Sequence, residues 1–268
     1  MSATQLAARD ASGALPQAAW VSELPEGSVY GSLYAAPEGE REAAADRFAA
    51  AGLPMHLDVI LDRDTTGALV HRGIATAEMR ELGARHPDSL LEVHLIVLAD
   101  ARHAAGTALA AELRAEISAV LEAAAAVGAQ RAALPAEVAA DAQLTADFRA
   151  AGGEVWTVLE PGDEPAAHPA ANPAAGPAAN PAASPAAMSS TGADGALVML
   201  IEPGTRQAAR PELLDRIPQL APTVQVGVDG GVDAVIARRA IALGAHHVIV
   251  GRALLGPEHP EAVRGEQS

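Results

Sequence analysis

Short apolar runs rich in Val, Leu and Ile alternate with Ala-rich stretches of helical period from residue 29 onward. Runs of this kind predict strands that are buried on both faces, as in a parallel sheet. The predicted strands cover residues 29–34, 55–61, 90–98, 130–134, 154–159, 196–202, 223–228 and 247–250. Helices are predicted at 37–51, 76–86, 104–127, 140–151, 211–220 and 233–243, and a last helical turn opens at Arg252. Eight strands separated by helices predict an α/β fold, the (β/α)8 TIM barrel.

One segment breaks this alternation. From residue 161 to 192 the chain reads Pro-Gly-Asp-Glu-Pro and then near-repeats of Asn-Pro-Ala-Ala and Pro-Ala-Ala, which predict a disordered or polyproline-like stretch. It could be a linker between domains or an excursion within one barrel, and we favour the excursion because the barrel needs strands on both sides. We therefore expect an N-terminal extension over 1–28 and a single barrel over 29–268, interrupted by a low-complexity insertion at 161–192.

Composition narrows the classes of partner. The chain has a net charge of −16 and no Lys, which argues against nucleic acid or an anionic membrane as a partner. An anionic small molecule would need local Arg or backbone N–H groups. The absence of Cys excludes disulfides and thiolate chemistry and fits a reducing cytosol. No apolar run approaches the ~18 residues of a membrane span, and residues 1–28 lack the features of a secretory signal. We expect a cytoplasmic protein that forms a homo-oligomer.

Polar residues interrupt three of the predicted strands. His56 and Asp58 are two apart on one strand and therefore face the same side, His94 lies in the next strand, and Asp229 ends the seventh before Gly230 and Gly231. Taken singly, each His is best explained as a hydrogen-bonded core residue, and Asp229 is best explained as a residue that favours the turn before Gly230. Taken together, four polar groups buried in an apolar barrel without partners would be costly. The set therefore predicts a site for one divalent metal ion of the Zn, Mn, Fe or Co type.

The chain resembles the ribulose-phosphate 3-epimerase family over about residues 29–256, apart from the insertion. The motifs that carry this resemblance are His56-Leu57-Asp58-Val59, Glu92-Val93-His94-Leu95, the run Leu-Val-Met-Leu-Ile-Glu-Pro-Gly at 197–204, Val228-Asp229-Gly230-Gly231-Val232 and Val250-Gly251. The resemblance implies a TIM barrel of the ribulose-phosphate-binding type with one divalent metal. It implies inversion at C3 of a ketopentose 5-phosphate, interconverting D-ribulose 5-phosphate and D-xylulose 5-phosphate.

The resemblance also implies a role for each matching residue. It makes His56, Asp58, His94 and Asp229 the metal ligands, with Asp58 and Asp229 as opposed acid/base carboxylates whose roles swap with reaction direction. The metal would act as a Lewis acid toward the developing enediolate. The substrate-binding residues expected from the matching motifs and from the first turn after the last strand are Ser32, His94, Gly204, Gly230, Gly231, Gly251 and Arg252.

The predicted phosphate site departs from the family. Where the family continues Glu-Pro-Gly with Phe-Gly-Gly-Gln, this chain has Thr205-Arg206-Gln207-Ala208, and Gly251-Arg252 replaces the usual Gly-Ser. A Met that packs near the metal in the family is Ile96 here. Either Arg206 and Arg252 take over phosphate binding, or the ligand has changed. The alternatives are an epimerase of a hexulose 6-phosphate or free ketose, and a non-catalytic barrel that binds metal or sugar phosphate.

We interpret the remaining polar residues as structural. His71, His86, His103 and His168 fall in predicted loops, helix ends or the insertion, and His246 and His247 begin a strand, away from the catalytic end. A solvated acidic loop is the favoured interpretation of Asp62 and Asp64.

Overall fold

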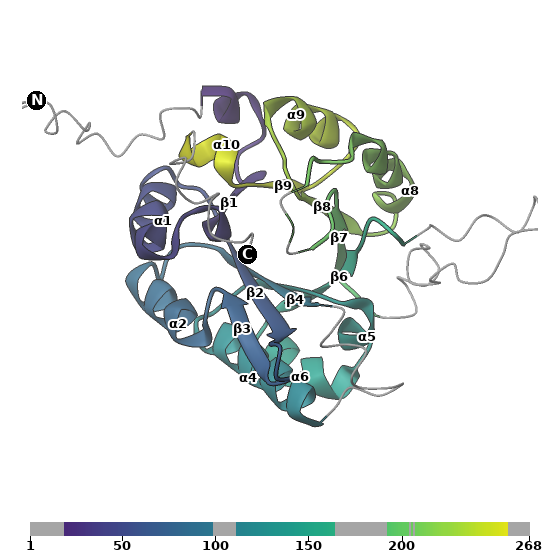
Figure 1. Ribbon diagram of the computed structural model, residues 1–268. Helices are drawn as coiled ribbons and strands as arrows, with labels where there is room; N and C mark the ends of the chain where they lie inside the picture. The colour runs from purple at the N-terminus through teal and green to yellow at the C-terminus, as the bar shows by residue number, and fades with distance from the viewer. Residues whose placement is uncertain (1–18, 99–110, 164–191, 204, 206, 257–268) are drawn as a thin grey trace, which may run out of the picture.

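Strands and helices alternate around a closed ring in the computed structural model of the chain (Figure 1), which describes residues 19–98, 111–163, 192–203, 205 and 207–256. Eight parallel strands form this ring within the described residues, in the order β1-β9-β8-β7-β6-β5-β4-β2, and β2 pairs with β1 to close it. Their bounds are β1 Val29–Ser32, β2 Met55–Arg63, β4 Leu91–Val97, β5 Arg131–Leu134, β6 Glu154–Leu159, β7 Gly195–Met199, β8 Gln225–Asp229 and β9 His247–Val250. The predicted (β/α)8 barrel is confirmed.

The helices surround the strands (Figure 1). They are α1 Arg41–Ala50, α2 Thr76–Arg85, α4 Ala111–Ala126, α5 Ala136–Ala139, α6 Ala142–Ala150, α8 Ile217–Leu220, α9 Ala234–Ala242 and α10 Arg252–Leu255. The predicted helix at 211–220 is wrong in part, because its first half is a 3-10 helix, Pro211–Arg216, and only four residues follow as α8. Part of the predicted helix at 104–127, residues 104–110, lies outside the described residues, as do 164–191 of the predicted insertion.

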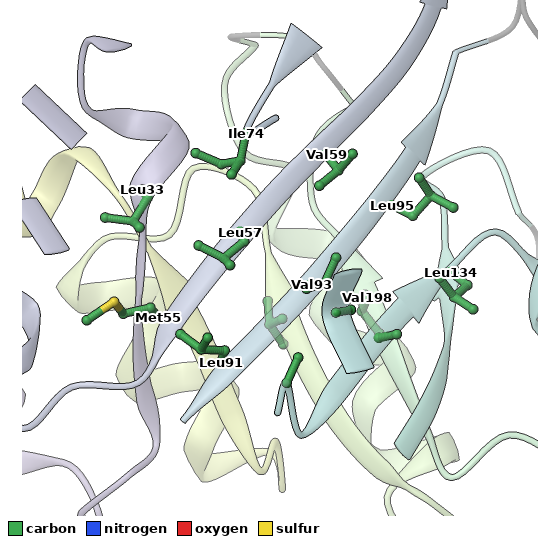
Figure 2. Close-up of a cluster of buried hydrophobic side chains, with 14 of the residues drawn as sticks. Leu33, Met55, Leu57, Val59, Ile74, Leu91, Val93, Leu95, Leu134 and Val198 are labelled. Carbon is green, nitrogen blue, oxygen red and sulfur yellow. The ribbon is translucent and has the colours of Figure 1, made fainter. Parts of the chain in front are cut away.

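Strand parity separates two apolar cores. Along β2, Met55, Leu57 and Val59 lie on the helix side with Ile74, as Figure 2 shows, and they belong to the large core between barrel and helices. The alternate residues point into the barrel. A smaller core fills the barrel interior and consists of Tyr30, Ala133, Trp156, Val158, Leu197, Met199 and Ile249. None of these residues comes from β2 or β4, whose inward positions carry His56, Asp58, Glu92 and His94 together with Ile60 and Ile96.

A β-hairpin extends β2 beyond the barrel. β2 continues to Arg63 and pairs antiparallel with β3 (Leu69–Gly73), a strand that the sequence pattern does not predict. The loop predicted at Asp62 is therefore wrong: Asp62 lies in β2, is buried, and pairs with Arg72 at 3.0 Å. Asp64 is half-buried and accepts hydrogen bonds in the tight turn that follows. Both carboxylates are thus engaged in the hairpin itself.

The N-terminal segment packs where the barrel has little helical cover. After β9 the described chain forms only the four-residue α10. A 3-10 helix, Ala19–Glu23, lies beside α9 and α10 in Figure 1. Its Trp20 and Val21 pack against the large core, and Glu23 pairs with Arg238 of α9 at 2.7 Å. No helix in the described part of the chain is long and apolar enough to cross a membrane.

Candidate metal centre

Three strands bring the four predicted ligands together. His56 and Asp58 are inward residues of β2, His94 lies beside Asp58 in the register of β4, and Asp229 ends β8. Each offers one nitrogen or oxygen atom, and these atoms all lie within 4.8 Å of one another. The histidines are buried and Asp229 is the most accessible, at 16% side-chain exposure. The cluster forms because parallel strands deliver their carboxyl ends to one face of the barrel.

The spacing and chemistry of these atoms fit a transition metal. Oδ1 of Asp58 lies 3.2 Å from Nε2 of His56 and 3.1 Å from Nδ1 of His94, while Oδ2 of Asp229 lies 3.8 and 3.7 Å from the same two nitrogens. Two ligands bound at about 2.1 Å to one ion are separated by about 3.0–4.2 Å, depending on the coordination angle. Two imidazoles with two carboxylates suit Zn, Mn, Fe or Co better than Ca or Mg.

The hydrogen bonds around the cluster orient its members. Nδ1 of His56 lies 2.8 Å from Oε1 of Glu92, so the imidazole donates its Nδ1–H there and directs Nε2 toward the cluster. Ser32 Oγ donates to Oδ2 of Asp58 at 3.2 Å, and the backbone N–H of Gly230 donates to Oδ1 of Asp229 at 2.6 Å. Each carboxylate therefore has one oxygen hydrogen-bonded to Ser32 or to the backbone of Gly230, and its other oxygen faces the two histidines.

Electrostatics make the cluster attractive to a cation. Burial alone would raise the pKa of Asp58, but contacts with His56 and His94 outweigh it and hold that pKa well below its usual range. Burial likewise opposes a charge on His56, yet the surrounding carboxylates, Asp58 foremost, raise its pKa well above the usual value. Burial raises the pKa of Asp229, and repulsion from Asp58 adds to the effect. Burial and the repulsion between Asp58 and Asp229 are thus electrostatic costs that a bound cation would relieve.

A cavity of about 660 Å³ opens directly onto the cluster. Asp58 and Asp229 line it, and the buried His56 and His94 stand outside its lining. Its remaining walls are part apolar and part polar, and include Ser32, Ile96, Met199, Thr205, Ile249 and Arg252. The volume suits a small-molecule ligand.

Glycines form part of the lining of this cavity. Gly230 and Gly231 have φ of 104° and 66°, a left-handed conformation that other residues rarely adopt. A Cβ on Gly230 would lie 2.9 Å from the backbone nitrogen of Ile201. A Cβ on Gly251 would lie 2.5 Å from Cβ of Ala35. These positions keep backbone close to the cavity, where it is available to a ligand.

The substrate-binding residues predicted from sequence are only partly gathered here. Ser32, Gly230, Gly231, Gly251 and Arg252 line the cavity. His94 is one of the four clustered residues and does not line the cavity, and Gly204 and Arg206 lie outside the described residues. The functions of all seven predicted residues stay predictions.

Two residues of the site's surroundings escaped the sequence analysis. In the sequence, Glu92 stands out only as part of a motif, and the pattern favours a structural role for His247 away from the site. The structure joins His247 to the site through Glu92. Both occupy inward positions two residues before another inward residue, His94 or Ile249. The two-residue alternation of inward and outward side chains along a strand is the signal that could have revealed them.

Comparison with known proteins establishes the fold and no more. No family model and no curated protein sequence matches the chain. Among solved structures, 3-hexulose-6-phosphate synthase from Salmonella typhimurium superposes with a TM-score of 0.52 at 12% identity, covering 84% of this chain and 89% of that one. Deoxyribose phosphate aldolase from Aeropyrum pernix gives a TM-score of 0.50 at 14% identity, covering 85% and 88%. These likenesses agree with the barrel described above.

Proposed function

We propose that the protein is a metal-dependent 3-epimerase of a ketose phosphate, with D-ribulose 5-phosphate and D-xylulose 5-phosphate as the first candidates. One observation carries this proposal: two carboxylates and two imidazoles converge within 4.8 Å, and both carboxylates face a cavity of about 660 Å³. The solved structures of similar fold, a hexulose-phosphate synthase and a deoxyribose phosphate aldolase, are named for phosphorylated sugars. The resemblance of the motifs to ribulose-phosphate 3-epimerases supports the specific reaction.

Asp58 and Asp229 would carry the proton chemistry. They come from β2 and β8, so a ketose whose C3 lies between them has a carboxylate toward each face. One carboxylate removes the C3 proton and the other returns a proton to the opposite face, which inverts the centre. A divalent ion held by the four clustered side chains would supply Lewis acidity toward the developing enediolate. Ser32 and the N–H of Gly230 hold the two carboxylates in place during the transfer.

The phosphate would bind to the lining of the same cavity. Arg252 and its neighbour Gly251 line the cavity, and so do Gly230 and Gly231. An Arg guanidinium and backbone N–H groups are the usual partners of a sugar phosphate. This arrangement favours a phosphorylated ketose over a free one.

Proton exchange in heavy water tests the reaction. The full-length protein is stripped with a chelator, reloaded in turn with Mn²⁺, Co²⁺, Fe²⁺ or Zn²⁺, and mixed with D-ribulose 5-phosphate in D2O. Because each carboxylate exchanges its proton with solvent, proton NMR should show xylulose 5-phosphate that carries deuterium at C3. Asp229→Asn should lower the rate by about 10²–10⁴-fold. Asp62→Asn is the matched control: this carboxylate lies on the same strand as Asp58 but pairs with Arg72, and its loss should leave the rate near wild type.

The substrates compared in the same assay separate the alternatives. A hexulose 6-phosphate and free D-ribulose are run beside the pentulose phosphate, and faster exchange on either would replace the proposed substrate while keeping the chemistry. If metal binds but no ketose exchanges its C3 proton with any of the four ions, the protein is not an epimerase, and a non-catalytic metal-binding barrel becomes the better account.

A further inference from the structure

A second polar group lies directly beneath the candidate metal centre, inside the barrel. Glu92 of β4 is 1% exposed, and its Oε1 accepts the hydrogen bond from Nδ1 of His56 at 2.8 Å. Its other oxygen, Oε2, lies 3.0 Å from Nε2 of His247 of β9 and 4.0 Å from Nη1 of Arg131 of β5, at ion-pair distances but without the alignment of a hydrogen bond. Glu92 is therefore held between residues of three other strands.

The groups that hold Glu92 are themselves fixed by packing. The ring of His247 is fully buried and stacks on Tyr30, with 4.3 Å between the ring centroids, and its centroid lies 5.1 Å from that of Trp156. The guanidinium of Arg131 lies 4.8 Å over the Trp156 ring. Side chains packed in this way have few alternative rotamers, so the position of the Glu92 carboxylate is well defined.

A buried carboxylate with this geometry does two things for a neighbouring imidazole. It accepts from Nδ1–H and so selects the form of His56 whose Nε2 lone pair faces Asp58 and Asp229. It also fixes the rotation of the ring and makes the imidazole a stronger electron donor. The guanidinium of Arg131, 4.0 Å from Oε2 of Glu92, balances the negative charge of this carboxylate, so Glu92 adds to the donor strength of His56 without leaving an uncompensated buried charge.

We propose that Glu92 is a positioning residue for metal binding, and that His247 acts through it as the second member of a carboxylate–imidazole relay running from β9 to the ligand on β2. This inference rests on the proposed metal site but on no particular substrate. Loss of such a partner lowers metal affinity by about 10–100-fold. The competing view is that Glu92 only satisfies polar groups in the barrel core, in which case its loss changes stability alone.

The experiment compares two carboxylates of the same polar layer. Glu92→Gln keeps the size of the side chain and removes its charge. Glu154→Gln is the matched control, because Glu154 pairs with Arg131 at 3.0 Å but does not touch His56. For each variant the Co²⁺ and Zn²⁺ affinities are measured by competition with a chromophoric chelator, and the stability of the metal-free protein is measured by urea unfolding. We expect Glu92→Gln to weaken both metals at least tenfold and Glu154→Gln to leave the affinities within twofold, whatever either does to stability.

NMR of ¹⁵N-histidine-labelled, Zn-loaded protein gives a readout that a purely structural role would not move. Wild type should show a downfield Nδ1–H proton of His56, assigned by its absence in His56→Asn, and Glu92→Gln should shift it upfield. His247→Phe should weaken the metals in the same direction by a smaller factor. Metal affinities unchanged in Glu92→Gln, or lowered equally in Glu154→Gln, would overturn the proposal. A wild type that binds metal normally but exchanges no ketose proton would refute the epimerase and leave the relay standing.

Discussion

Binding of a divalent ion to His56, Asp58, His94 and Asp229 should raise the unfolding temperature of the protein. The ligand atoms of the histidines and carboxylates already lie 3.1–3.8 Å apart, so little rearrangement is needed to bind. Nearly all of the binding free energy should therefore appear as added stability, because the unfolded chain does not hold these four groups together.

The size of the effect follows from mass action. At a free metal concentration of 100 times the dissociation constant, binding to the native state alone adds about 2.7 kcal/mol. For a domain near this size, each kcal/mol moves the midpoint by about 2–4 °C. The expected rise is therefore about 5–11 °C.

Differential scanning calorimetry of chelator-stripped protein, with and without Co²⁺ or Mn²⁺, measures this rise. His94→Asn removes one ligand and should abolish most of it. His71→Asn is the control, since His71 is an imidazole of the β2–β3 hairpin that pairs with Glu116 of α4 and takes no part in the cluster. It should retain the full rise. The reasoning is refuted if neither Co²⁺, Mn²⁺ nor Zn²⁺ moves the midpoint of wild type, or if His94→Asn responds as strongly as His71→Asn.

Three further predictions concern packing and charge. Gly251→Ala places a Cβ 2.5 Å from that of Ala35 and should lower the free energy of unfolding by about 1–3 kcal/mol in urea unfolding. Gly39→Ala is the control, because its Cβ would meet nothing within 4 Å. Equal urea midpoints for the two variants would contradict the steric argument. Leu57→Ala empties a fully buried position on the helix side of β2 and should lower the free energy of unfolding by about 2–5 kcal/mol, while metal affinity stays within a few-fold of wild type. A loss of metal affinity without a loss of stability would contradict the separation of the helix-facing side of β2 from its barrel-facing side. In Glu92, contacts with His247 and His56 outweigh burial and lower the pKa, so its stabilisation of the metal-free protein is complete above the unfolded-state value near ~4.3 and is lost as the pH falls toward the folded-state value. The urea midpoint of wild type should therefore fall more steeply than that of Glu92→Gln between pH 5 and pH 3 (about one unit either side of the unfolded-state value), and parallel curves would contradict it.

The sequence was sufficient for the barrel and for the inward set of polar residues. β2 and β4 are regular strands buried on both sides, so a period of two correctly groups His56 with Asp58 and separates both from Leu57. Buried parallel strands are also the elements whose apolar runs are easiest to recognise. The prediction that these polar residues converge depended on barrel closure, which the pairing of β1 with β2 supplies.

Two features depend on interactions that no local pattern contains. β3 is partly exposed and half polar, and it forms because it pairs with the end of β2 and contacts α4 through His71. Its composition therefore resembles a loop. Glu92 and His247 meet only because the closed barrel places the first residues of β4 and of β9 on opposite sides of its interior, with their side chains pointing inward. Each residue viewed alone is a polar residue at the start of a strand.

Anomalous diffraction from crystals of the metal-loaded protein tests the metal site most directly. Data collected on both sides of the absorption edge of Co or Zn locate the ion independently of any assumed ligand. The account predicts one strong peak at about 2.0–2.2 Å from Nε2 of His56, Nδ1 of His94 and one oxygen each of Asp58 and Asp229. No peak between these four side chains, or a peak held by other residues while they keep only their hydrogen bonds to one another, would contradict it.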